Sequence, residues 1–255
     1  GDEYLCFAAE FATTPADTFR VCSAGTAASA APPGTTLFVA NFGSSSVTGG
    51  TVAGDGSLTG VTSTSVAGPF GIAISGTTAY VANYNGNSVT RCTIAGTSLT
   101  DCATMTTTGS PNFNQPTGIA ISGTTAYVVN YGGDSVTQCT IDGTSLTGCA
   151  TTGSSFTFPY GIAISGTTAY VTNWGSSTSG GNSVTQCTIA GTSLTDCATM
   201  PTTGTPNFSS PSGIAISGTT AYVTNYYGDS VTQCTIAGTS LTDCATMPTT
   251  GTPNF

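Results

Sequence analysis

The sequence predicts an all-β chain built from repeated units of four strands, and three observations lead to this prediction. The phrase Gly-Ile-Ala-Ile-Ser-Gly-Thr-Thr-Ala-Tyr-Val begins at Gly71, Gly118, Gly161 and Gly213. Short runs of β-branched and aromatic residues are bounded by Gly, Asn and Ser, which is typical of strands joined by turns. No long run of residues combines helical periodicity with a cap.

Each repeat contains four short strands. In the repeat that begins at Gly71, we expect strands at residues 72–74, 79–82, 89–94 and 99–104. The repeat is about 45 residues long, and four strands in that length are typical of one blade of a β-propeller. A β-solenoid is the rival architecture, but its coils usually need shorter repeats. The sequence therefore predicts a β-propeller of four-stranded blades.

The repeats divide the chain into two parts. Residues 35–255 hold the propeller repeats, and residues 1–34 form an N-terminal hairpin or closing segment. The repeat part supplies five sets of the three outer strands of a blade. For the innermost strand of the first set, the only candidate is residues 27–33.

The N-terminal hairpin leaves the number of blades open. We expect it from residues 4–8 and 18–22, which carry Cys6 and Cys22. In one interpretation, five blades close alone and the hairpin caps them. In the other, the hairpin is half of a sixth blade, which further chain or a neighbouring subunit completes by strand complementation.

The cysteines predict a disulfide framework. The chain has 10, and the last eight form pairs with one constant spacing. Each pair would face across a hairpin, where opposed α-carbons lie about 4.5–5.5 Å apart and a disulfide fits. Gly50 and Val61 replace both members of the pair in the first repeat, which supports bonding within a repeat. The cysteines are Cys6, Cys22, Cys92, Cys102, Cys139, Cys149, Cys187, Cys197, Cys234 and Cys244.

These disulfides indicate an oxidising compartment, so we expect a secreted or cell-surface protein. Zinc is the alternative use of paired cysteines, but its ligands usually lie closer together and often include His. The N-terminus looks like a mature end left after removal of a signal peptide.

Composition excludes several classes of function. Charged residues make up 5% of the chain, the net charge is -9, and there is no His. The absence of His excludes Ser-His-Asp and Cys-His catalysis, and the absence of Lys excludes a Schiff base. Arg20 and Arg91 are the only basic residues, too few to follow a nucleic-acid backbone. We therefore predict no catalytic residue, no cofactor, no metal, no nucleic-acid partner and no insertion into a membrane.

The sequence resembles a known family in the segments around Tyr-Val-Thr-Asn, at residues 170–173 and 222–225. Together with the preceding Gly-Ile-Ala-Ile-Ser, these resemble the YVTN family of β-propeller repeats, which is related to NHL and lactonase-like propellers. The resemblance implies the propeller fold over residues 35–255. Functions in such propellers range from surface-layer and adhesion proteins to ligand binders and some enzymes. The His and acidic metal ligands of the enzymatic relatives have no counterpart here.

An aromatic residue follows one aligned Asn in each repeat. Around a ring, these side chains would either stack on sugars or pack over neighbouring blades. Trp174, the only Trp, precedes an insertion at residues 176–180, and loops that depart from a repeat often carry function. The ligand-binding candidates are Phe42, Tyr84, Tyr131, Trp174 and Tyr226.

The aligned asparagines have two interpretations. A ring of amides could bind a glycan or an ion, but Asn side chains commonly bond the backbone of their own turn, and we assign them this structural role. They are Asn41, Asn83, Asn130, Asn173 and Asn225.

Other polar positions have similar alternatives. Asp134, Asp229, Asn87 and Asn182 could hold calcium, but one carboxylate per blade favours ordinary turn chemistry. Three aspartates precede the second Cys of a pair and form an expected acidic rim, namely Asp101, Asp196 and Asp243. Asn207 lies in a glycosylation sequon, which matters only in a glycosylating host.

A Thr-rich sequence, Thr-Met-Pro-Thr-Thr-Gly-Thr-Pro-Asn-Phe, occurs at residues 199–208 and 246–255, with a diverged copy at residues 104–113. It could be an adhesive or glycosylated loop, or a spacer between blades.

The sequence favours a non-enzymatic, secreted or cell-surface propeller with a structural or adhesive role. Its partners would be further subunits, joined into filaments or layers by strand complementation, or glycans. The alternative is a binding module for a carbohydrate or small ligand at the face around Trp174. A metal-dependent hydrolase or lyase is the third interpretation, which the absent His and the scattered acids disfavour.

Overall fold

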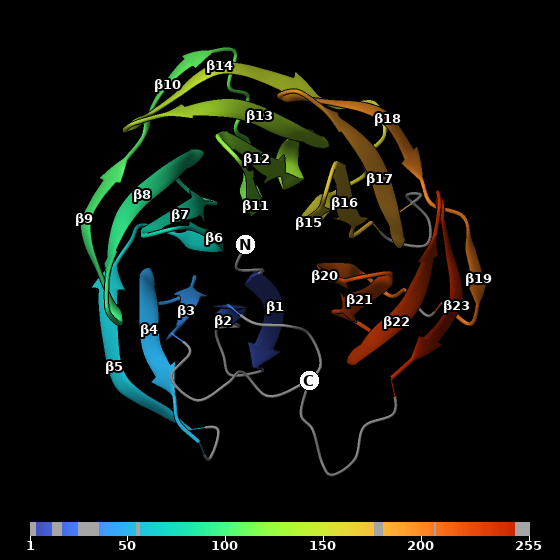
Figure 1. Cartoon of the computed structure of the whole chain (residues 1–255), viewed down its shortest axis with the longest axis horizontal. Coiled ribbons are helices and arrows are strands. Elements are labelled where there is room, and N and C mark those ends of the chain that lie inside the picture. The colour runs from blue at the N-terminus through green and yellow to red at the C-terminus, as the bar shows by residue number, and fades with distance from the viewer. Residues whose placement is uncertain are drawn as a thin grey trace.

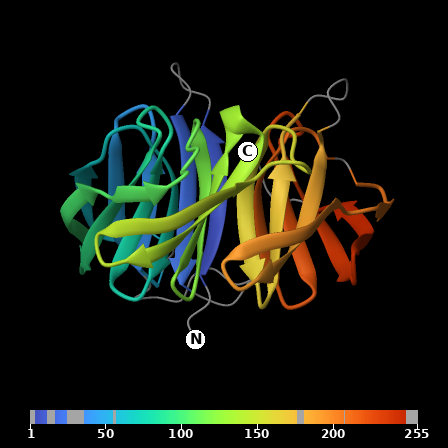
Figure 2. The same ribbon diagram turned by 90° about the horizontal axis from the view of Figure 1, so that it is seen from above.

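The computed structural model shows an all-β, five-bladed propeller (Figure 1). Figure 2 shows the disc from the side, with the outer strands strongly tilted relative to the inner ones, as sheet twist requires. In the described part of the chain, no helix is long and apolar enough to cross a membrane. The structure describes residues 4–11, 17–24, 36–54, 57–175, 181–206 and 208–247, with side chains from Thr36 onward.

Blades 2 to 5 each contain four antiparallel strands in chain order from the axis outward. Blade 2 consists of β6 (Pro69–Ser75), β7 (Thr78–Asn83), β8 (Ser88–Ala95) and β9 (Ser98–Thr104). Blade 3 consists of β11 (Pro116–Ser122), β12 (Thr125–Asn130), β13 (Ser135–Asp142) and β14 (Ser145–Thr152), with the short helix η1 (Tyr131–Gly133) after β12. Blade 4 consists of β15 (Pro159–Ser165), β16 (Thr168–Asn173), β17 (Ser183–Ala190) and β18 (Ser193–Thr199). Blade 5 consists of β20 (Pro211–Ser217), β21 (Thr220–Asn225), β22 (Ser230–Ala237) and β23 (Ser240–Thr246).

Blade 1 is built differently, because the N-terminal hairpin belongs to its sheet. The strand order is β1-β2-β3-β4-β5. Its strands are β1 (Tyr4–Phe11), β2 (Asp17–Ala24), β3 (Thr36–Asn41), β4 (Ser46–Val52) and β5 (Leu58–Ser65). Of the two interpretations, the one in which the hairpin is half of a sixth blade is therefore wrong. The prediction of an innermost strand at residues 27–33 is wrong too, since β2 pairs with β3 in that place; residues 27–33 themselves lie outside the described residues.

The register of the hairpin places Cys6 opposite Cys22. Their side chains lie outside the described part of the structure. β1 is an additional strand on the axial side of β2, and it lies against β20 of blade 5. At the other junctions of blades 2 to 5, the innermost strands of neighbouring blades pack on each other directly.

Two of the Thr-rich linkers form a fifth strand on the next blade. After blade 2, β10 (Thr106–Gly109) pairs in parallel with the outer strand β14 of blade 3. After blade 4, β19 (Thr202–Gly204) pairs in parallel with β23 of blade 5. These linkers are therefore more than spacers, since they extend the sheet of the blade that follows.

Glycines allow the innermost strands to approach one another near the axis. A Cβ at Gly71 would clash with the carbonyl oxygen of Thr117 in the next blade, and a Cβ at Gly118 would lie 2.8 Å from that of Tyr160. The opening Gly of the repeated phrase is thus a requirement of close backbone packing.

Four disulfides join the outer two strands of blades 2 to 5. They link Cys92 to Cys102, Cys139 to Cys149, Cys187 to Cys197 and Cys234 to Cys244, with α-carbons 4.1 to 4.2 Å apart. The register shifts at each pair, so that two residues of the outer strand face one Cys of its neighbour, which is a β-bulge.

The residue before the second Cys adopts the left-handed conformation that this bulge needs. It is Asp101 in blade 2 (φ 51°) and Gly148 in blade 3 (φ 55°). Blade 1 keeps the bulge through Gly60 (φ 57°), although it lacks the cysteines. Asp and Gly tolerate this conformation better than other residues, which accounts for their recurrence at this position.

Candidate functional site

Aromatic side chains gather on one face of the propeller and contact one another in a continuous series. We call this group the aromatic cluster. Neighbouring rings have centroids 4.7 to 6.1 Å apart. The cluster consists of Phe42, Phe70, Tyr84, Tyr131, Phe158, Tyr160, Trp174, Tyr226 and Tyr227.

The structure brings together all five aromatic residues that the sequence singled out. Each directly follows the second strand of the four-stranded repeat, so the propeller places them at equivalent points around the axis. Sequence reasoning missed Phe70 and Tyr160, which lie in β6 and β15 and join the two sides of the cluster at 5.3 Å. Both precede the Gly of the repeated phrase, where the other blades have Thr117 and Ser212.

Trp174 lies at the most connected point of the cluster. Its ring contacts those of Tyr131, Tyr160 and Tyr226 at 5.3 to 5.6 Å. Tyr227 stacks on it at 6.1 Å with an interplanar angle of 24°, and 72% of Tyr227 is exposed. The buried indole Nε1 has no hydrogen-bond partner among the described residues. The rings thus hold Trp174 in place and present Tyr227 to solvent.

The cluster is aromatic and contains no Asp, Glu, Lys or Arg side chain. Burial raises the pKa of Tyr84 above its usual value of 10.0. Burial also raises the pKa of Tyr131, and the nearby Tyr84, Tyr227 and Asp134 raise it further by disfavouring a second negative charge. Such a surface can stack on flat or ring-shaped apolar groups, including the faces of sugars.

The aligned asparagines are engaged within their own blades. Asn130 donates from Nδ2 to Thr137 Oγ1 at 2.9 Å and accepts at Oδ1 from the backbone N–H of Asn114 at 3.3 Å. Asn173 and Asn225 make the same pair of bonds. Asn41 and Asn83 donate to the equivalent Thr at 2.8 Å. These amides fasten the turn and the incoming linker, and they do not form an open ring of ligands.

The Asn and Asp residues of the following turn join neighbouring blades, which sequence reasoning did not anticipate. Asp134 Oδ1 accepts from the backbone N–H of Phe158 at 2.6 Å, where the next blade begins. Asn87 and Asn182 accept equivalent bonds at 2.7 and 2.8 Å. Asp229 has no such bond among the described residues. In the described part of the chain, no three His, Cys, Asp or Glu residues lie together as a metal site would require.

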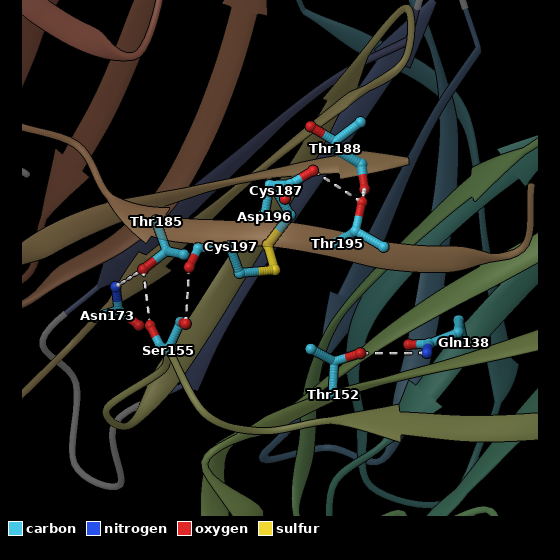
Figure 3. Close-up of a disulfide and its surroundings, with 10 residues drawn as sticks. All are labelled: Gln138, Thr152, Ser155, Asn173, Thr185, Cys187, Thr188, Thr195, Asp196 and Cys197. Carbon is cyan, nitrogen blue, oxygen red and sulfur yellow. Dashed lines mark hydrogen bonds between the residues drawn. A yellow bond between two sulfur atoms is a disulfide. The ribbon is translucent and has the colours of Figure 1, made fainter. Parts of the chain in front are cut away.

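The outer strands carry the disulfides and the expected acidic residues. Figure 3 shows the Cys187–Cys197 disulfide, with Asp196 accepting from Thr195 Oγ1 at 3.2 Å. The linker from blade 3 reaches this strand, because Ser155 Oγ donates to the carbonyl oxygen of Cys197 at 2.8 Å. Three exposed aspartates point outward at this position, Asp101, Asp196 and Asp243. Asn207 and the insertion at residues 176–180 lie outside the described residues.

Comparison with solved structures shows the same fold at low identity. A catalytically inactive virginiamycin B lyase from Staphylococcus aureus, solved with quinupristin, superposes with a TM-score of 0.58 at 11% identity, covering 96% of this chain and 89% of the lyase chain. A nidogen/laminin complex gives 0.66 at 14% identity, covering 95% and 93%. A putative 6-phosphogluconolactonase from Bacteroides fragilis gives 0.62 at 14% identity, covering 95% and 81%.

The likeness is one of fold. These structures come from enzymes and from a non-enzymatic complex, so they carry no function over to this chain. No protein-family model matches the sequence, and no curated protein is similar to it.

Proposed function

We propose that this chain is a non-enzymatic, secreted or cell-surface propeller of the YVTN type, with a structural or adhesive role, that assembles with further copies into filaments or layers. One observation carries the proposal. Thr-rich segments of this chain already bind the outer edges of its sheets, as β10 binds β14 and β19 binds β23. Addition of a strand to an exposed edge is a common way for proteins to recognise extended segments.

Other sheets of the described chain have no additional strand on their outer edge. In the described residues, β5, β9 and β18 end their sheets with no further strand. Natural proteins often block such edges with Lys or other charges, and this chain has no Lys and a charged content of 5%. The edge strand β5 carries no charged residue, whereas β9 and β18 each carry one exposed aspartate.

The disulfides support the proposed secreted or cell-surface location. Four of them staple the outer strands of successive blades, which suits an oxidising environment outside the cytoplasm. Each closes a short loop and stabilises by roughly 2.8 kcal/mol in the chain-entropy model. A disulfide in each of four blades favours a stable subunit, and a structural protein needs stability more than it needs an adaptable active site.

Electron microscopy of the undenatured protein, taken from its native source, tests the proposal. We expect regular filaments or layers whose subunits have the size of one propeller. Separate discs at every protein concentration would contradict the assembly. The reduced protein is the control, because loss of the staples should loosen the subunits.

A second function has an observation of its own. The aromatic cluster presents Tyr227 stacked on Trp174, which suits a binding module for a carbohydrate or small ligand. Because Trp174 is the only Trp, its fluorescence reports on this end of the ring. We expect a saturable change with a bound glycan and a weaker one in Tyr227→Ala. Thr124→Ala is the control, since Thr124 is exposed and outside the cluster. No saturable change with a broad glycan panel would contradict this function.

A further inference from the structure

Four of the five junctions between blades bury a hydrophobic cluster, and the described residues hold no such cluster at the fifth. The junction between blades 4 and 5 packs Tyr170, Val184 and Met200 against Leu241. Comparable clusters fill the junctions of blades 1 and 2, 2 and 3, and 3 and 4. We call the fifth junction, between blades 5 and 1, the open junction. In Figure 1, β22 and β23 stand on one side of it and β4 and β5 on the other.

Blade 5 presents an apolar face to the open junction. Met105 and Met200 follow the last strands of blades 2 and 4 and are 4% and 3% exposed, because the next blade covers them. Met247 has the same place after blade 5 and makes the same backbone bond, yet it is 36% exposed. Val231 is half-buried, whereas its equivalents Val89 and Val184 are fully buried.

Blade 1 presents the matching apolar face. Leu58 and Val61 of β5 are 41% and 55% exposed. In blade 5, the equivalent Leu241 and Cys244 are buried in the cluster that blade 4 completes. The edges of β9 and β18 at least receive side-chain hydrogen bonds from the preceding blade, and β5 receives none from blade 5 among the described residues.

The sequence after Met247 is the one that covers an edge elsewhere. Residues 246–255 repeat residues 199–208 without change. In the earlier copy, Thr202 lies opposite Leu241 and Gly204 opposite Cys244. By the same alignment, Thr249 and Gly251 correspond to Thr202 and Gly204, and Leu58 and Val61 correspond to Leu241 and Cys244.

We propose that the open junction binds a second copy of this chain: blade 5 of one copy packs on blade 1 of the next, and residues 246–255 add to β5 of that copy as a parallel fifth strand. The inference rests on the proposed function, and it identifies the surfaces through which two copies associate; we call this contact the joint. Such a head-to-tail contact uses two different faces, so it builds filaments or closed rings.

A second copy fits this joint better than the chain's own blades do. Elsewhere, adjacent innermost strands pack directly, as β15 does on β20. At the open junction, β1 lies between β20 and β2, so an additional strand separates blade 5 from the rest of blade 1. The outer faces are thereby left available to another molecule.

Two variants that each block one face test the joint. Leu58→Glu places a charge on the blade 1 face, and Met247→Glu places one on the blade 5 face. Thr124→Glu is the matched control, because Thr124 is exposed in the turn between β11 and β12 of blade 3 and the net charge changes equally. Light scattering after size-exclusion chromatography gives the mass over a range of concentrations. We expect the wild type and the control to associate. Each face variant should associate at least roughly tenfold more weakly than the wild type.

Mixing the two face variants gives the decisive result. One intact joint remains, between the unchanged blade 5 of Leu58→Glu and the unchanged blade 1 of Met247→Glu. We therefore expect a species of two chains and nothing larger. Face variants that associate as the wild type does would overturn this joint and leave the proposed assembly in place. A wild type that keeps the mass of one chain throughout would overturn both.

Discussion

Blade 5 takes part in two junctions, one with blade 4 and one with blade 1, and equivalent residues of the repeat are packed differently in the two. In the first, Met200 is buried, a Thr-rich linker covers the outer edge, and Asn182 bonds the start of the next blade. In the second, Met247 is exposed, β5 has a free edge, and Asp229 has no cross-blade bond among the described residues. Equivalent residues thus contribute differently to the stability of the fold, because the neighbouring blade is what buries them.

This comparison separates the local from the non-local part of blade stability. Strand pairing and disulfides lie within one blade, and they persist in blade 5 up to its last strand. The apolar cluster and the cross-blade hydrogen bonds need two blades. Repeat proteins have this general property, in which stability is a sum of terms within a repeat and terms between neighbours.

The largest expected effect comes from removal of equivalent leucines. Leu241→Ala should lower the free energy of unfolding by about 2–5 kcal/mol, because Leu241 is fully buried in the closed junction. Leu58→Ala should change it by less than about 0.5 kcal/mol at a concentration where the protein is monomeric, since that side chain is exposed. Urea unfolding monitored by circular dichroism measures both. Equal losses would show that the open junction is closed in solution.

A new disulfide in blade 1 should have the next largest effect. A Cβ at Gly50 would lie 3.4 Å from a methyl carbon of Val61, and Gly60 provides the left-handed residue of the bulge. Gly50→Cys with Val61→Cys should therefore stabilise the oxidised protein by about 2–3 kcal/mol. The control is the same pair changed to Ser. Thermal unfolding of the two variants gives the difference, and no gain would mean that blade 1 does not limit stability.

Local chemistry in the sequence predicted the blades well. The repeated Gly-Ile-Ala-Ile-Ser and Tyr-Val-x-Asn segments alternate in the way that strands require, and the constant spacing of the cysteines placed the disulfides of blades 2 to 5. These features depend on residues that lie close together in the chain. The five aromatic residues of the candidate site followed from the same register.

Features that depend on distant residues were not visible in the sequence. The hairpin strand β2 carries Thr-Phe-Arg-Val-Cys and does not resemble the innermost strand of the repeat, so its place in blade 1 was missed. The strands β10 and β19 are runs of Thr and Gly without apolar alternation, and their partners belong to the next blade. The bond between Asp134 and Phe158 was missed because it joins two blades.

The cross-blade bond gives a smaller and more specific effect. Asp134→Ala removes the acceptor for the Phe158 N–H and should cost about 1 kcal/mol, whereas Asp229→Ala removes no such bond among the described residues. Both residues adopt the left-handed conformation (φ 44° and 41°), so the strain of Ala there cancels in the comparison. Urea unfolding of the two variants at neutral pH measures the difference. Equal losses would assign the effect to the turn alone.

The smallest effect expected is a loss of stability at alkaline pH that depends on Tyr170. Burial in the closed junction raises the pKa of Tyr170 above 10.0, more than its hydrogen bond with Thr168 lowers it. The neutral phenol is therefore favoured in the folded state. Its contribution is fully present below pH 10.0 and is lost as the pH rises through the higher folded pKa, at up to about 1.4 kcal/mol per pH unit within that short window. Urea unfolding across this range should show a shallower decline in Tyr170→Phe than in the wild type. The matched control is Tyr222→Phe, which changes the equivalent residue of blade 5. If both variants decline alike, burial by the neighbouring blade does not control this group.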